Sequence, residues 1–107
     1  MDRNDKAILR MLSHISRILA FCNGKNYDDF CANNMLFDAV VMNLLQIGEQ
    51  ARNLDDDFCK RRDDIPWHDI KNVRNRIVHG YDDIDMSIIW QIVTEDLPDL
   101  KQRLENT

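Results

Sequence analysis

The spacing of apolar residues along this chain predicts a protein made only of helices. Apolar side chains recur at steps of three and four residues, which is the repeat of a helix with one buried face. No segment alternates apolar and polar residues as a half-buried strand would. Because the chain has only 3 Gly and 2 Pro residues, long helices are favoured over a turn-rich fold. We therefore expect an all-α protein, built as a small antiparallel helical bundle.

Signals for helix ends divide this pattern into segments. We expect helical structure over residues 4–22, 27–33, 35–54, 65–80 and 85–104. Gly24 follows the first segment, where a glycine suits the left-handed position after a helix. Pro66 should occupy the first helical position of the fourth segment, where its missing N–H loses no hydrogen bond. Asp85 should cap the start of the last segment.

Two stretches should interrupt the helices. The charged residues 55–64 should end the long helix 35–54 or add a frayed turn to it. Pro98 lies inside the last segment and should bend or split it near Thr94. Proline cannot donate the hydrogen bond of a helix interior, and its ring crowds the preceding turn.

Gly48 lies within the long helix, where glycine costs about 1 kcal/mol relative to alanine. Two interpretations stay open. A neighbouring helix or a second chain comes too close to leave room for a side chain, or the glycine is merely tolerated.

Composition places the chain among small globular proteins. Its 107 residues fit a single domain, 1–107, and a core this small often gains stability by dimerising. No run of about 20 apolar residues could span a membrane, and the polar start Met1–Lys6 does not resemble a signal peptide. Cys22, Cys31 and Cys59 form neither a zinc pattern nor a convincing disulfide set, so we expect buried thiols in a reducing cytoplasm.

The formal net charge of −5 limits how the chain could bind nucleic acid. Proteins that coat RNA or DNA are usually basic. Any contact with a nucleic acid must therefore come from a local basic patch, or from a site formed where two chains meet.

The candidate chemistry lies in residues 74–81, which read Arg-Asn-Arg-Ile-Val-His-Gly-Tyr. On a helix that turns about 100° per residue, Arg74 falls in the middle of the apolar face. A buried arginine without a partner is costly, so Arg74 needs an anion, a cluster of carbonyls or a facing subunit. Asn75 and His79 are four residues apart and share a neighbouring edge of the helix.

These side chains suit one kind of reaction. Arginine binds two phosphate oxygens with a planar fork, and histidine takes and returns a proton near neutral pH. With no cluster of metal ligands nearby, Arg74 and His79 suit metal-free cleavage of RNA, in which a 2′-hydroxyl attacks the adjacent phosphorus. Tyr81 would return to the side of Arg74 if the helical path continued past Gly80.

Ordinary structural roles also remain open for each of these residues. A histidine near a helix end is more often a cap than a catalyst. An arginine on an apolar face is more often part of an interface salt bridge. Tyr81 could simply cover the core and keep its hydroxyl in water.

The motif resembles the signature of a known family. Arg74, four residues, His79, one residue and Tyr81 is similar to the pattern of HepT-like toxins, which belong to the HEPN (higher eukaryotes and prokaryotes nucleotide-binding) superfamily. The similarity covers most of the chain, from about Ile8 to Leu104. Its flanking elements are Ile47-Gly48-Glu49, Ala51, Ile65-Pro66-Trp67 and Asp96-Leu97-Pro98-Asp99-Leu100.

The resemblance implies a HEPN-like bundle that forms a homodimer, with the Arg–His motifs of two chains lining one cleft. It implies a metal-independent endoribonuclease that acts as a toxin and needs no cofactor. Arg74 and His79 would be catalytic, and Asn75 would support them. Two copies of Lys71 and Arg76 facing the same cleft would give an acidic protein a local basic site for RNA.

The resemblance also implies a protein partner. HepT-like toxins are silenced by an antitoxin of the minimal nucleotidyltransferase type, which can transfer AMP to the tyrosine of the motif, here Tyr81. A bulky, negatively charged phosphate at that position would occupy the space that an RNA phosphate needs.

Two other interpretations compete with the ribonuclease. The chain could be a non-catalytic module that binds a nucleotide or docks a nucleotidyltransferase, with Arg74 holding a phosphate. The acidic residues Asp82, Asp83 and Asp85, which would repel an RNA backbone, fit such a small ligand better. Alternatively, the motif could only cap the core of a structural bundle.

Overall fold

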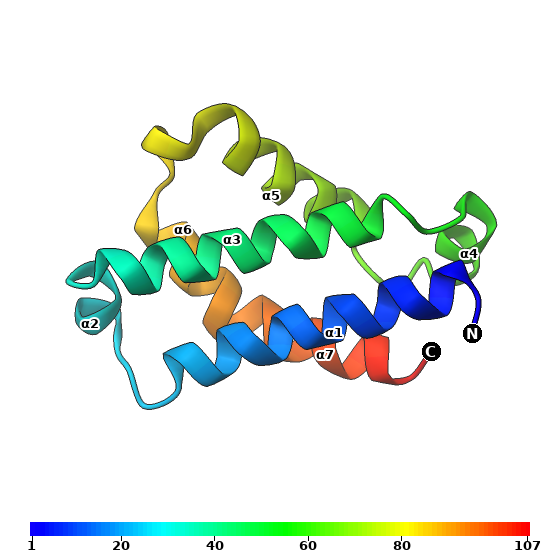
Figure 1. Cartoon of the computed structure of the whole chain (residues 1–107), viewed down its shortest axis with the longest axis horizontal. Helices are drawn as coiled ribbons and strands as arrows, with labels where there is room; N and C mark the ends of the chain where they lie inside the picture. Colours follow the sequence, from blue (N-terminus) through cyan, green and yellow to red (C-terminus); the bar gives the residue numbers. More distant parts are fainter.

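Helix α3 (Asn34–Ala51) forms the centre of the fold, with α1 (Arg3–Cys22) packed on one side and α5 (Trp67–Gly80) on the other. The computed structural model describes all 107 residues. In Figure 1, each of these helices runs antiparallel to its neighbour, and the two ends of the chain lie at the same end of the bundle. The chain contains helices and turns but no strand, which confirms the predicted all-α class.

Short elements complete the bundle. They are α2 (Tyr27–Cys31), α4 (Asp56–Arg61), the 3-10 turn η1 (Tyr81–Asp83), α6 (Met86–Gln91), the π-helical turn η2 (Ile92–Asp96) and α7 (Leu97–Glu105). The last three form one continuous helical rod that brings α7 back against α1. Phe30 of α2 is fully buried, with its ring centroid 5.7 Å from that of Phe37 and 5.1 Å from that of Trp90. This aromatic cluster ties α2 to α3 and α6 and closes one end of the core.

Local sequence explains where the first helices begin. Asp2 caps α1 by accepting from the backbone N–H of Asp5, and the Asp5 carboxylate accepts from the backbone of Asp2 in return. Asn26 and Asp29 form the same reciprocal pair at the start of α2. Between the two helices, Gly24 has a φ of 74°, which confirms the predicted left-handed turn.

The charged stretch after α3 differs from its prediction. Residues Asp56–Arg61 form a separate helix, α4, instead of a frayed extension of the long helix. The acidic side chains of α4 lie in its first turn and the basic ones in its last turn, an arrangement that the helix dipole stabilises. The long helix itself ends at Ala51, three residues before the predicted end, and Leu54 is buried in the turn that follows.

Pro66 was predicted to occupy the first helical position of α5, but it precedes the helix. Its ψ of 68° is not helical, while its carbonyl already accepts the N–H of Ile70. Pro66 is therefore the N-cap, and the helix starts one residue later at Trp67.

Pro98 was predicted to bend or split the last helix near Thr94, and the helix loses its regular α-helical hydrogen bonds there without being interrupted. The rod widens into the π-helical turn η2, in which the N–H of Leu97 bonds the carbonyl of Ile92, five residues back. Thr94 lies in this turn, and its hydroxyl donates to the carbonyl of Trp90 at 2.9 Å. The wider turn lets the chain continue where proline offers no N–H.

The three cysteines are free thiols, and only one of them is buried. Burial raises the pKa of the Cys22 thiol. Cys31 and Cys59 are half-buried, so the expectation of three buried thiols was wrong for two of them. No helix combines the length and the apolar character needed to cross a bilayer.

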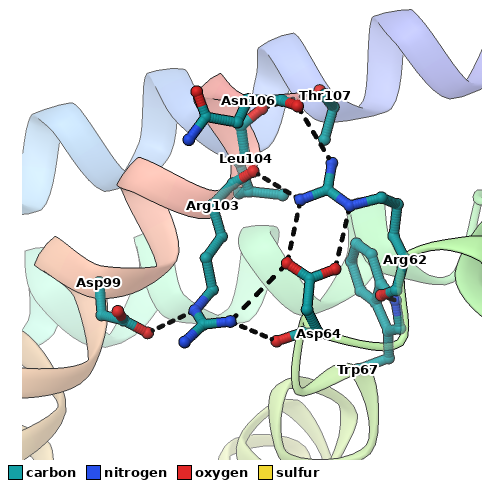
Figure 2. Close-up of polar contacts among 8 residues, drawn as sticks. All are labelled: Arg62, Asp64, Trp67, Asp99, Arg103, Leu104, Asn106 and Thr107. Atoms are coloured by element: carbon teal, nitrogen blue, oxygen red, sulfur yellow. Dashed lines mark hydrogen bonds and ion pairs between the residues drawn. The ribbon is translucent and has the colours of Figure 1, made fainter.

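A polar network joins the segment before α5 to the end of α7 (Figure 2). The guanidinium of Arg62 donates to both carboxylate oxygens of Asp64, at 3.0 and 3.2 Å, and to the carbonyl of Arg103 at 2.9 Å. Arg103 in turn donates to the backbone carbonyl of Asp64 at 2.9 Å and to the carboxylate of Asp99 at 2.8 Å. The indole of Trp67 completes the network by donating to the carbonyl of Arg62 at 3.0 Å.

Because of this network, the stability of the folded protein should depend on pH through the titration of the Asp64 carboxyl. The hydrogen bond from Arg62, assisted by the charges of Arg62 and Arg103, lowers the pKa of the Asp64 carboxyl below its ordinary value. The stabilisation is therefore complete above about pH 4, where an unfolded aspartate titrates, and is lost as pH falls through the lower folded pKa. Melting temperatures measured from pH 5 downwards should fall less steeply for Asp64→Asn than for the wild type. Asp63→Asn is the control, because Asp63 forms no ion pair, and an equally shallow slope for both variants would contradict the assignment.

Candidate functional site

Helix α5 carries the motif on a largely uncovered surface. It packs on α3, and of its 14 residues only Trp67 and Ile77 are buried. Figure 1 shows α5 at the outer side of α3, away from α1. The motif side chains other than Ile77 therefore lie at least partly open to solvent.

Gly48 marks a close approach between α3 and α5. A Cβ atom at this position would lie 2.4 Å from the Cβ and 2.9 Å from the Cγ of Arg74. Both distances are far below van der Waals contact, so only glycine leaves room for the arginine stem. Of the two interpretations of Gly48, the close approach is confirmed, and the neighbour belongs to the same chain.

Arg74 finds its partners within its own chain. Its Nε donates to Oε1 of Glu49 at 2.5 Å, and its Nη1 donates to Oδ1 of Asn75 at 3.0 Å. The hydrogen bond and the charge of the guanidinium lower the pKa of the Glu49 carboxyl. The Arg74 side chain keeps 20% of its surface exposed. Of the three partners that the sequence left open for Arg74, the structure shows an anion, the Glu49 carboxylate on α3, so pairing alone does not require a second subunit.

Arg74 and His79 open onto different hollows of the single chain. Arg74 lines an open hollow over α3 and α5, together with Glu49 and Val78. Asn75 and His79 line a groove of about 660 Å³ between α5 and α6. Within one chain, the guanidinium of Arg74 and the imidazole of His79 therefore do not share a cavity. Asn75, which bonds Arg74 and also lines the groove, connects the two hollows.

The groove has an apolar floor and a mixed polar rim. Its apolar lining comprises Val73, Ile77, Ile84, Ile88, Ile89 and Ile92. On its rim, Arg76 and the exposed His79 face the carboxylate residues Asp83 and Asp85. His79 lies in the last turn of α5 and makes no side-chain hydrogen bond within the chain. No group of three or more His, Cys, Asp or Glu side chains is arranged to hold a metal ion.

The two basic residues predicted to assist RNA binding are separated. Arg76 lines the groove, whereas the exposed Lys71 lines neither hollow. Lys71 lies instead near Cys59 beside α4, where its charge opposes the rise of the thiol pKa caused by burial. Only Arg76 thus lies where a ligand of the groove would meet it.

The helical path does not continue past Gly80, whose φ of −152° and ψ of 38° are not helical, and Tyr81 begins the 3-10 turn η1. Tyr81 nevertheless contacts α3, as Arg74 does. Its hydroxyl donates to the carboxylate of Asp38, and its ring centroid lies 6.2 Å from that of Phe37. The hydrogen bond to Asp38 raises the pKa of the Tyr81 phenol. Tyr81 is still 44% exposed, so a protein partner can reach it.

Sequence reasoning missed the acceptors Asp38 and Glu49. Their spacing held a signal, because they share one face of α3 with the intervening apolar residues, at steps of four, three and four: Asp38, Met42, Leu45 and Glu49. This face lies next to Arg74, Val78 and Tyr81. We call these seven residues the α3–α5 seam. Within it, Met42 is 54% and Val78 is 47% exposed.

Comparison with known proteins gives matches over nearly the whole chain. A family model described as Ribonuclease HepT-like matches residues 11–107. A protein of Methanocaldococcus jannaschii named as a putative RNase is 34% identical over 104 residues, which cover 96% of this chain and 95% of that protein. A protein of Thermococcus cleftensis named probable ribonuclease HepT is 31% identical over 106 residues, covering 98% and 96%. No solved structure matches the chain.

Proposed function

Because the chain belongs to the HepT-like ribonuclease family, we propose that it is an endoribonuclease that cuts RNA without a metal ion. The proposed catalytic residues are Arg74 and His79, and Asn75 supports them. One observation carries this proposal: a braced, partly exposed guanidinium lies five residues along α5 from an exposed imidazole that has no hydrogen-bond partner in the chain.

The proposed reaction is an internal transfer within RNA. The ribose 2′-oxygen attacks the adjacent phosphorus, a bond forms between them, and the bond from phosphorus to the 5′-oxygen breaks. His79 moves the proton between these oxygens. Arg74 stabilises the negative charge that develops on the phosphoryl oxygens. The products are a 2′,3′-cyclic phosphate and a 5′-hydroxyl end.

We place the complete site at the cleft of a homodimer. Two features of the single chain support this arrangement. Arg74 and His79 line separate hollows, so a second copy could supply the residue that each hollow lacks. Beside Arg74, the seam exposes Met42 and Val78, and a facing subunit would remove these apolar surfaces from water. Two copies of Arg76 would then add positive charge near the RNA.

We further propose that the protein is the toxin of a toxin–antitoxin pair in the cytoplasm. Its antitoxin would be a minimal nucleotidyltransferase that transfers AMP to Tyr81. Tyr81 is 44% exposed, and its hydroxyl bonds Asp38 on α3, the helix whose Glu49 bonds Arg74. A phosphate attached to Tyr81 would bind the guanidinium of Arg74 and so compete with the RNA phosphate for it.

The test is cleavage of RNA by the purified protein in the presence of EDTA. We expect the wild type to cut RNA and to leave cyclic phosphate ends, and we expect His79→Ala to show no cleavage above background. Both proteins should first be shown by intact mass to carry no AMP, and by melting temperature to be folded. If they are equally inactive under these conditions, the proposed ribonuclease is wrong.

A non-catalytic nucleotide-binding module remains the second candidate. The carboxylates of Asp83 and Asp85 on the groove rim favour it, because they would repel a long phosphate backbone more than a single nucleotide. Calorimetry with mononucleotides distinguishes the two. Binding that is lost in Arg74→Ala, or in Arg76→Ala, which removes a side chain that lines the groove, without any RNA cleavage by the wild type, would support this second candidate.

A further inference from the structure

We propose that Glu49 is a positioning residue, which holds the guanidinium of Arg74 so that its free end meets the scissile phosphate. This inference rests on the proposed ribonuclease activity and extends it to α3. The starting observation is the hydrogen bond at 2.5 Å from Nε of Arg74 to Oε1 of Glu49.

The atoms used in this contact decide its role. Glu49 accepts from Nε, on the side of the guanidinium, and Asn75 accepts from Nη1. Nη2 and one hydrogen of Nη1 therefore remain free at the end of the fork. An arginine bound in this way can still donate two parallel hydrogen bonds to phosphate oxygens. A carboxylate placed across both Nη atoms would instead compete with the phosphate.

The stem of Arg74 is fixed by the same stretch of α3. Gly48 leaves just enough room for the Cβ and Cγ of Arg74, and the adjacent Glu49 then holds the Nε at the far end of the side chain. Both ends of a long, flexible side chain are thus restrained by consecutive residues. Such restraint removes rotamer freedom before the substrate arrives, which favours the geometry of the transition state.

The charge of Glu49 supports the same role. Its pKa is lowered, so the carboxylate stays ionised at neutral pH and keeps its attraction for the guanidinium. Arg52 also approaches Glu49, but at 3.5 Å from the same oxygen, so Arg74 has the shorter contact. Glu49 therefore orients Arg74 first.

The experiment measures kcat and KM for RNA cleavage by the wild type and by Glu49→Ala, Glu49→Gln, Arg74→Ala and the double variant Glu49→Ala/Arg74→Ala. A displacement of about 1 Å in a catalytic group lowers rates by roughly 100-fold, so we expect Glu49→Ala to lower kcat by about 10- to 100-fold with little change in KM. Glu49→Gln, which keeps an oxygen acceptor for Nε, should recover part of this loss. The double variant should be no slower than Arg74→Ala, because Glu49 acts only through Arg74.

Glu105→Gln is the matched control, since Glu105 pairs with Lys101 at the end of α7, away from the motif. It should keep the wild-type rate, and all variants should melt within a few degrees of the wild type. Three outcomes would overturn the positioning role while leaving the ribonuclease intact: an unchanged kcat in Glu49→Ala, a lower KM in that variant, or additive losses in the double variant. If the wild type cuts no RNA, the proposed function and this inference both fail.

Discussion

Arg74→Ala should remove nearly all RNA cleavage while leaving the protein folded. Of the two proposed catalytic residues, only Arg74 carries positive charge at every working pH. Loss of one preorganised donor to a developing oxyanion lowers kcat by about 100- to 1,000-fold, and we expect a loss of that size. By contrast, partly exposed ion pairs such as Arg74–Glu49 contribute only about 0–1 kcal/mol to stability. The melting temperature should therefore fall by only a few degrees.

Arg74→Lys separates the role of charge from the role of the fork. Lysine keeps the positive charge but cannot donate to Glu49 from an Nε and to a phosphate from two Nη atoms at once. We expect it to be nearly as slow as Arg74→Ala. Arg10→Ala is the control for the net charge that Arg74→Ala removes, because Arg10 is exposed on α1 and makes no ion pair. Cleavage at a wild-type rate by Arg74→Lys would show that the site needs only a point charge.

The main helices could be predicted because their signals are local. The apolar steps of α1 and α3, the left-handed Gly24 and the break before Pro98 each depend on neighbouring residues, and the structure agrees with them. The errors concern segments whose structure depends on distant partners. The charged stretch that contains α4 was expected only to end the long helix or add a frayed turn to it, yet Phe58 of α4 packs against Trp67, with ring centroids 6.2 Å apart. No periodicity over six residues could have indicated that contact.

The site could be predicted only in part, for a similar reason. The sequence predicted that Arg74 lies on an apolar face and needs an anion, a cluster of carbonyls or a facing subunit, and the structure supplies the first of these. It did not show which carboxylate among 19 acidic residues would serve, because the answer depends on how α3 and α5 pack. The register of the two helices selects Glu49 for Arg74 and Asp38 for Tyr81. The sequence did place His79 on a different edge of the helix from Arg74, but the packing of α5 against α3 and α6 is what makes these edges open onto two separate hollows.

The register itself depends on Gly48, and Gly48→Ala should disturb both stability and cleavage. The new Cβ would lie 2.4 Å from the Cβ of Arg74, an atom too close to the backbone to move unless α5 moves with it. Overpacking of this kind costs about 1–3 kcal/mol or more, of which alanine recovers about 1 kcal/mol through its helix propensity. So close a contact puts Gly48→Ala at the upper end of this range, with a net loss of about 2 kcal/mol. At about 4–8 °C per kcal/mol, we expect the melting temperature to fall by roughly 8–16 °C.

Gly80→Ala is the matched control for Gly48→Ala. A Cβ at Gly80 would meet no atom within 4 Å, and its φ of −152° lies outside the left-handed region that favours glycine. Its melting temperature should stay at or above that of the wild type. Gly48→Ala should also lower kcat, because a displaced α5 carries Arg74 away from Glu49. If thermal melts show that Gly48→Ala is as stable as Gly80→Ala, α3 and α5 are not held together at the distance that places Arg74.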